Sequence, residues 1–205
     1  MTLSKVLGAV ALALLLAAPM QDVARAQAPQ VVRVRATIES VDGSLITAKS
    51  RDGAEIKVKL ADNAPVTEII KASLADVKTN SYVAVTGLPQ PDGSQKAIAL
   101  YIFPEAQRGL AEGHRPWDFQ ANSTMTNATV DNEVAGVDGQ TLTLKYKDGE
   151  QKVLVTPATE ITTAAKKSAA DLRAGQKISV FAAKKLPDGS VEAPNLNFGD
   201  YGVWR

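Results

Sequence analysis

The sequence predicts an all-β fold: two tandem, small, OB-like five-stranded barrels, each with a short helical turn, that follow an N-terminal signal helix. Three observations lead to this prediction. The chain repeats itself once, both copies contain runs in which apolar and polar residues alternate, and Asp-Gly turns separate some of those runs. Its 205 residues leave room for one large or two small domains once a signal is removed.

The N-terminus has the pattern of a secretory signal. Lys5 precedes an apolar run at residues 6–18, and Ala24-Arg25-Ala26 supplies an A-x-A cleavage site. We expect a signal peptide at residues 1–26 and export to the periplasm or beyond. The apolar run is shorter than the roughly 17–25 residues that a membrane-spanning helix needs. Contact with a membrane is therefore expected only through an uncleaved signal, if at all.

Short motifs recur in the same order along the chain. Three pairs share an offset of 96 residues: Val41-Asp42-Gly43 with Val137-Asp138-Gly139, Asp52-Gly53 with Asp148-Gly149, and Pro91-Asp92-Gly93-Ser94 with Pro187-Asp188-Gly189-Ser190. Two further pairs lie between them with small gaps: residues 67–69 with 159–161, and residues 73–77 with 168–172. Five ordered matches indicate a duplication. We place the first barrel at residues 27–103, a linker at 104–127 and the second barrel at 128–205.

Each copy reads as three strands, a helical turn and two strands. In the first copy, Val32, Val34, Ala36 and Ile38 alternate with polar residues, which is typical of a half-buried strand. The remaining elements expected there are strands at 44–49, 55–60, 82–86 and 97–103, with a turn at 71–77 that Ser73 can cap. The second copy predicts strands at 129–135, 140–146, 151–155, 177–182 and 191–198, with a turn at 168–172.

This order of elements matches a five-stranded Greek-key barrel of the OB type. A β-sandwich of short strands is the alternative. We favour the barrel because closure removes exposed strand edges in so small a domain.

The motifs also resemble an uncharacterised OB-like repeat family of secreted bacterial proteins, a domain of unknown function. Three segments of the chain, residues 103–109, 112–118 and 123–129, resemble a subset of proteobacterial exported proteins. Some of these carry the label "metal ABC transporter permease". A permease needs several membrane spans, and no part of residues 27–205 is apolar enough for one. The resemblance therefore implies at most a role with metals, and it supplies no catalytic residues.

Composition excludes several classes of function. The expected signal holds two of the basic residues and one of the acidic residues, so residues 27–205 contain 21 of each. A neutral chain with few aromatic residues on its strands does not predict nucleic-acid binding. Cysteine is absent, which excludes disulfides and thiolate chemistry. No phosphate-binding loop or nucleophile motif occurs, so we expect no enzymatic activity and no cofactor, unless a divalent metal binds.

The linker is the strongest candidate for a functional segment. It holds the only histidine, and four of the ten aromatic residues lie between Tyr101 and Phe119. Such long connections are usually functional or disordered. One interpretation is that the aromatic rings join the two barrels, and the other is a ligand groove at the joint. The residues expected to contact a ligand or partner are Tyr101, Arg108, His114, Arg115, Trp117 and Phe119.

A metal site is the alternative reading of the same segment. Glu112, His114 and Asp118 offer an imidazole and two carboxylates, and Met125 adds a soft ligand. Their spacing matches no common metal motif. We therefore expect a periplasmic non-enzymatic binding or adaptor protein that contacts an envelope protein or small ligand through the linker. The alternative hypothesis is a periplasmic metal-handling accessory protein that uses His114 and nearby carboxylates.

Overall fold

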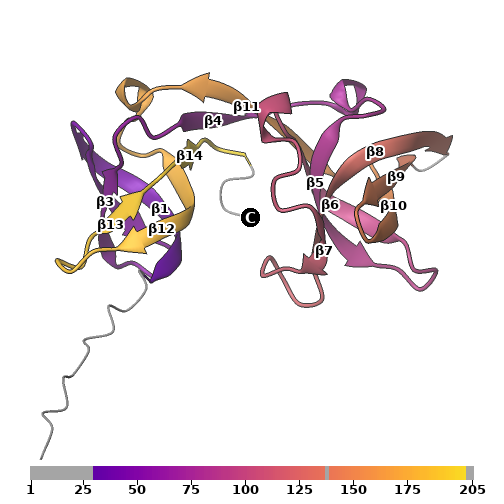
Figure 1. Ribbon diagram of the computed structural model, residues 1–205, viewed down its shortest axis with the longest axis horizontal. Coiled ribbons are helices and arrows are strands. Elements are labelled where there is room, and N and C mark those ends of the chain that lie inside the picture. Colours follow the sequence, from indigo (N-terminus) through magenta and orange to yellow (C-terminus); the bar gives the residue numbers. More distant parts are fainter. Residues whose placement is uncertain (1–29, 137–138, 202–205) are drawn as a thin grey trace, which may run out of the picture.

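The computed structural model describes residues 30–136 and 139–201, which form strands, turns and loops without an α-helix (Figure 1). The prediction of an all-β chain is confirmed. No helix within these residues is long and apolar enough to cross a membrane. The expected signal at 1–26 lies outside the described residues, as do Val137 and Asp138 of the second Val-Asp-Gly motif.

One set of five strands closes into a barrel that we call the first ring. Its order is β1-β2-β3-β13-β12 and back to β1. These strands are β1 (Val31–Asp42), β2 (Leu45–Ser50), β3 (Glu55–Leu60), β12 (Lys177–Lys185) and β13 (Val191–Ala193). Buried apolar side chains fill it, among them Ile38, Ile46 and Ile178. β14 (Leu196–Phe198) follows β13 and pairs with β12.

A second set of five strands closes in the same way, and we call it the second ring. Its order is β5-β6-β10-β9-β8 and back to β5. These strands are β5 (Tyr82–Pro89), β6 (Gln95–Ile102), β8 (Thr124–Gly136), β9 (Gly139–Tyr146) and β10 (Gly149–Val155). A separate apolar core fills it, with Val83, Leu100 and Leu142 fully buried.

Two antiparallel strands carry the chain between the rings. β4 (Val66–Lys71) and β11 (Glu160–Lys167) pair with each other from Val66 opposite Lys167 to Lys71 opposite Thr162. In Figure 1 they span the space between the two lobes. β4 also pairs with β14, and β11 pairs with β6, so this ribbon continues into both rings. Val66 at one end is buried in the first core, and Ile161 is buried in the second.

Each ring draws strands from both of the copies predicted from the sequence. Barrels at residues 27–103 and 128–205 would each close on one copy, whereas the observed rings exchange their last strands through β4 and β11. The duplication predicted from the sequence would explain why the exchange fits. Ala36 lies opposite Ile178 in the first ring, and Ala128 lies opposite Val83 in the second, so equivalent strands meet equivalent partners.

Single turns of 3-10 helix follow the crossing strands, as the repeat predicts. η1 (Leu74–Asp76) follows β4, and η3 (Ala169–Asp171) follows β11. In the first, the Ser73 hydroxyl donates to Asp76 Oδ2 at 2.7 Å, and in the second the Ser168 hydroxyl donates to Asp171 Oδ2 at 2.8 Å. These Ser-x-x-Asp boxes cap both turns and redirect the chain into the next ring.

Candidate functional site

The segment between the repeats folds back onto the second ring as a β-hairpin. After η2 (Glu105–Gln107), β7 (Gly113–Pro116) pairs antiparallel with the first residues of β8, from Gly113 opposite Asn127 to Pro116 opposite Thr124. β8 therefore starts inside the expected linker 104–127. Its residues Thr124–Asn127 pair with β5 on one side and β7 on the other, so this part of the linker is a structured part of the sheet.

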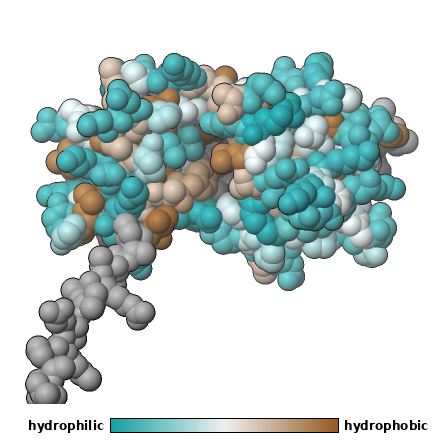
Figure 2. All heavy atoms as spheres, in the orientation of Figure 1, coloured by the Kyte–Doolittle hydropathy of each residue, from teal (hydrophilic) through white to brown (hydrophobic). Residues whose placement is uncertain are grey.

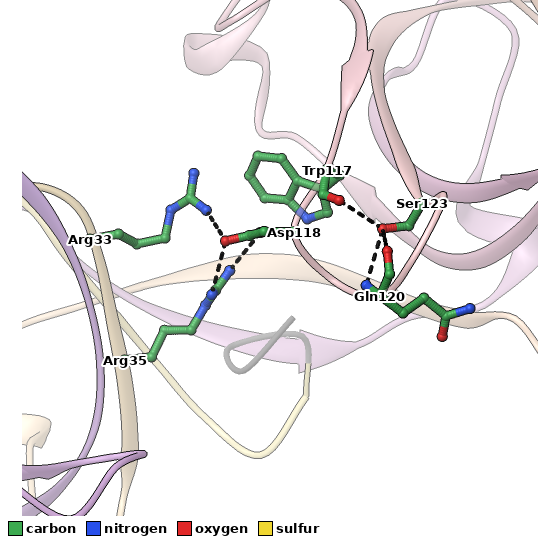
Figure 3. A network of polar contacts seen from close by, with 6 residues as sticks. All are labelled: Arg33, Arg35, Trp117, Asp118, Gln120 and Ser123. Carbon is green, nitrogen blue, oxygen red and sulfur yellow. Dashed lines mark hydrogen bonds and ion pairs between the residues drawn. The ribbon is translucent and has the colours of Figure 1, made fainter.

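A compact loop closes this hairpin at residues 117–123. The backbone N–H of Trp117 donates to the backbone carbonyl of Ser123 at 2.8 Å. The Ser123 side chain is buried, and its hydroxyl oxygen lies 3.0 Å from the Trp117 carbonyl and 2.8 Å from the Gln120 carbonyl. The Gln120 N–H donates back to the same hydroxyl at 3.1 Å. These contacts hold the loop in one shape and present Trp117 and Asp118 at its tip (Figure 3).

The hairpin tip contacts the first ring through Asp118. Arg33 Nη1 donates to Asp118 Oδ2 at 2.7 Å, and Arg35 Nη2 donates to Asp118 Oδ1 at 3.4 Å (Figure 3). Both arginines lie on β1. Partial burial raises the pKa of Asp118, but the hydrogen bond from Arg35 and the charges of both arginines outweigh it, so the pKa lies below its ordinary value. The ionised carboxylate therefore links the hairpin of one ring to a strand of the other.

Aromatic and cationic side chains stack beside this ion pair. The Arg33 guanidinium lies 4.5 Å from the centre of the Trp117 ring and 5.7 Å from that of Phe181 on β12. Arg115 approaches Trp117 at 5.7 Å. Such contacts contribute about 0.5–1 kcal/mol each at exposed sites. Phe181 remains 44% exposed. Figure 2 shows hydrophilic residues over most of the face in view, with apolar residues beside the joint.

The base of the linker is anchored on the second ring. Arg108 Nη2 donates to the Asn80 carbonyl at 2.8 Å and to Glu105 Oε2 at 2.7 Å. The Leu110 carbonyl accepts from the Tyr82 hydroxyl at 3.1 Å and from Asn127 Nδ2 at 3.0 Å. Arg108 thus has a structural role between the linker and the ring, away from the hairpin tip.

Tyr101 is placed in a different cluster. Its ring meets Phe103 edge-on at 4.8 Å, and Phe103 lies 5.1 Å from Tyr82. Burial raises the pKa of Tyr101 to about 12, so the hydroxyl stays neutral. Phe119 is half-buried within the hairpin loop. Of the six expected contact residues, the structure brings Arg115 and Trp117 together at the joint.

The four residues considered for a metal site do not form one cluster in the structure, since each has its own partner or lies on a different element. His114 Nδ1 lies 2.8 Å from the Thr126 hydroxyl, and its ring stacks on Tyr146 at 6.5 Å. Burial and the nearby Arg115 charge lower the pKa of His114. Glu112 accepts from the Lys147 N–H, Asp118 pairs with arginines, and Met125 lies on β8. Among the described residues, no three histidine or carboxylate side chains are grouped to hold a metal ion.

Three residues at the joint escaped the sequence analysis: Arg33, Arg35 and Phe181. Alternation along residues 32–38 indicated that both arginines face outward. It held no information about which distant segment would face them. Phe181 lies in the predicted strand 177–182, where its outward position gave no signal of an aromatic contact across repeats.

A concave surface lies beside the crossing strands, away from the hairpin tip. It is a groove of about 920 Å³ bounded by the loop after β3, by β4 and β11, and by the turn that starts the linker. Its lining is mostly small side chains, including Ala61, Ala64, Ala106 and Ala164, together with Lys166 and Lys167. Glu68 forms an ion pair with the neighbouring Lys167 at 3.0 Å.

Comparison with known proteins identifies one family match. The family described as Domain of unknown function (DUF5666) matches residues 133–194. These residues run from the end of β8 to β13, so the match contributes strands to both rings. No curated protein and no solved structure matches the chain.

Proposed function

We propose that this chain is an exported, non-enzymatic binding or adaptor protein of the periplasm, built from two OB-like barrels, that binds a protein or small ligand at the joint between them. The observation that carries the proposal is the hairpin tip. Trp117 and Asp118 reach from the second ring to Arg33 and Arg35 on the first, beside the exposed ring of Phe181.

The chemistry of the joint favours recognition. Guanidinium groups, an indole and a phenyl ring provide planar surfaces, and the guanidinium groups also donate charge-assisted hydrogen bonds. Side chains of these types are enriched where proteins bind partners. The charged N-terminus, apolar run and A-x-A site support export. Because the hairpin belongs to one ring and its arginine partners to the other, a ligand at the tip would contact both lobes.

Site-specific photo-crosslinking tests this proposal. A photoreactive phenylalanine analogue replaces Phe181 in the full chain expressed in cells. The matched control carries the same analogue at Leu45, an apolar residue of the first ring that is 39% exposed and pairs with the far end of β1. We expect a discrete adduct from position 181 that is at least tenfold weaker from position 45.

The adduct must also depend on the joint. We expect Trp117→Ala to reduce it at least fivefold while the circular dichroism spectrum and the urea midpoint show a folded protein. Equal crosslinking from positions 181 and 45, or an adduct at 181 that Trp117→Ala leaves unchanged, contradicts the proposal.

A further inference from the structure

β1 extends beyond its neighbour β2. Residues Ala36 to Asp42 pair with β2, and the first rung joins Ala36 to Ser50. The preceding residues, from Val31 to Arg35, pair with β12 on one side. Within residues 30–136 and 139–201, no strand pairs with them on the side where β2 has ended. In the part of the chain that the structure describes, this length of β1 therefore has a neighbouring strand on one side only, in a ring that is otherwise closed.

The second ring shows what an occupied edge of this kind looks like. Ile38 in β1 and Val130 in β8 each precede a bulge at the same point of the repeat, so Val32–Arg35 correspond to Thr124–Asn127. In the second ring, β7 pairs antiparallel with those four residues of β8. The residues of β7 come from the linker, and among the described residues the first ring has no counterpart of this strand.

Side-chain pattern and charge define what fits this edge. Val34 is buried and Val32 packs against the core, while Arg33 and Arg35 point outward. Both guanidinium groups contact Asp118 on this outward face of the strand. A shallow hollow where β2 ends is lined by Thr37, Glu39, Lys49, Ser50 and Arg51.

A second copy of the chain would suit this edge poorly. Antiparallel pairing of two such edges would place Arg33 and Arg35 of one chain beside the same arginines of the other, and like charges directly opposite each other destabilise a sheet. A strand with apolar residues toward the core and acidic residues outward would meet Val32 and Val34 on one face and the arginines on the other.

We propose that the β1 edge from Val31 to Arg35 binds an extended segment of a partner protein, with alternating apolar and acidic residues, as an added antiparallel strand. This inference rests on the proposed binding function and names the class of partner. Main-chain hydrogen bonds supply affinity in this mode, and alternate side chains supply specificity. The hairpin tip that holds Arg33 and Arg35 then lies directly beside the docked segment.

A synthetic hexapeptide that alternates valine and glutamate tests this inference on residues 27–205. Its C-terminal cysteine is carried as a 2-pyridyl disulfide, so that a protein thiolate attacks the peptide sulfur and releases pyridine-2-thione. The chain contains no cysteine, so Val31→Cys gives one reactive thiol beside the edge, where Val31 is 59% exposed. Leu45→Cys is the control on the same ring. We expect the mixed disulfide to form at least tenfold faster with Val31→Cys than with Leu45→Cys, under conditions where both thiols react equally with a small disulfide.

Two altered peptides separate strand pairing from general attraction. N-methylation of alternate amides, tested in both registers, removes donors along one edge of the peptide, and one register is expected to lose at least tenfold in rate. A peptide with lysine in place of glutamate is also expected to react at least tenfold more slowly. Equal rates for all peptides overturn the inference, and so does a Val31→Cys disulfide dimer that excludes the peptide. An intact Phe181 crosslink alongside such a failure would leave the proposed function standing.

Discussion

Asp118 is shared by Arg33 and Arg35, and it comes from a loop more than eighty residues away in the chain. All three side chains are partly exposed, with 52% of the Asp118 side chain accessible. Ion pairs of this kind contribute about 0–1 kcal/mol. The contact of Asp118 with the two arginines therefore matters through its position. It orients the hairpin tip on β1, and Trp117 then stacks over Arg33.

Acid should release this contact. The pKa of Asp118 is lowered in the folded chain, so its contribution is present above the unfolded value of about 3.9 and is lost as the pH falls through the lower folded value. In a Trp204→Phe background, Trp117 is the only tryptophan and reports the stacking. We expect its emission to change in a transition below about pH 4.

Asp118→Asn is the control for that titration. It removes the charge and keeps the shape, so its emission at pH 7 should resemble that of the parent chain in acid, with no further transition. An acid transition of the same size in Asp118→Asn would show that another group governs the contact.

The crossing strands depend on one close approach of two elements. Gly199 directly follows β14 and has φ +138°, and a Cβ there would lie 2.6 Å from the Ile69 carbonyl oxygen of β4. Its N–H donates to the Lys177 carbonyl at 3.0 Å. Because that φ strains any other residue and no space exists for a side chain, only glycine lets β14 lie against both β4 and β12.

Gly199→Ala should therefore be costly. We expect it to lower the free energy of unfolding by about 2 kcal/mol or more, from strain together with the clash. Gly189→Ala is the matched control, since Gly189 also has positive φ but no atom within 4 Å of the added Cβ, and it should cost about 1 kcal/mol. Urea unfolding measures both. Equal losses would mean that backbone strain alone matters at Gly199.

Much of the molecule could be predicted from local signals. Alternation along residues 32–38 and the Asp-Gly turns indicated the strands, and the Ser-x-x-Asp matches at 73–76 and 168–171 marked the turns. The exchange of strands could not be predicted in this way. Because the two copies present equivalent residues, such as Val83 and Ile178, the strands of one copy fit either ring, and local sequence does not distinguish the two arrangements.

The candidate site shows the same limit. Composition alone drew attention to Trp117, and it does lie at the joint. Asp118 was considered as a metal ligand, whereas its nearest cations are two arginines of β1. A pattern within one strand shows which face a side chain occupies. It does not show which distant segment will lie against that face, and Arg33, Arg35 and Phe181 were missed for that reason.

For the whole molecule, strand exchange predicts that the two halves cannot separate without unfolding. Among the described residues, seven strand pairings join the chain before Gly109 to the chain after it. A site for a sequence-specific protease, inserted after Gly109 in the exposed loop, allows the chain to be cut after folding. We expect both pieces to elute together at the mass of the intact chain and to separate only in denaturant.

The cut must also be made in a chain that lacks the contact between the hairpin tip and β1. Two barrels that each close on one copy, held together only by that contact, would also elute together after the cut. In Trp117→Ala/Asp118→Asn, a joint that depended on the tip would fall apart after cleavage. Exchange predicts that the pieces remain together, because neither ring can close without strands from both. Separation of this cut variant under native conditions, at a concentration where the uncut variant is folded, would contradict the exchanged architecture.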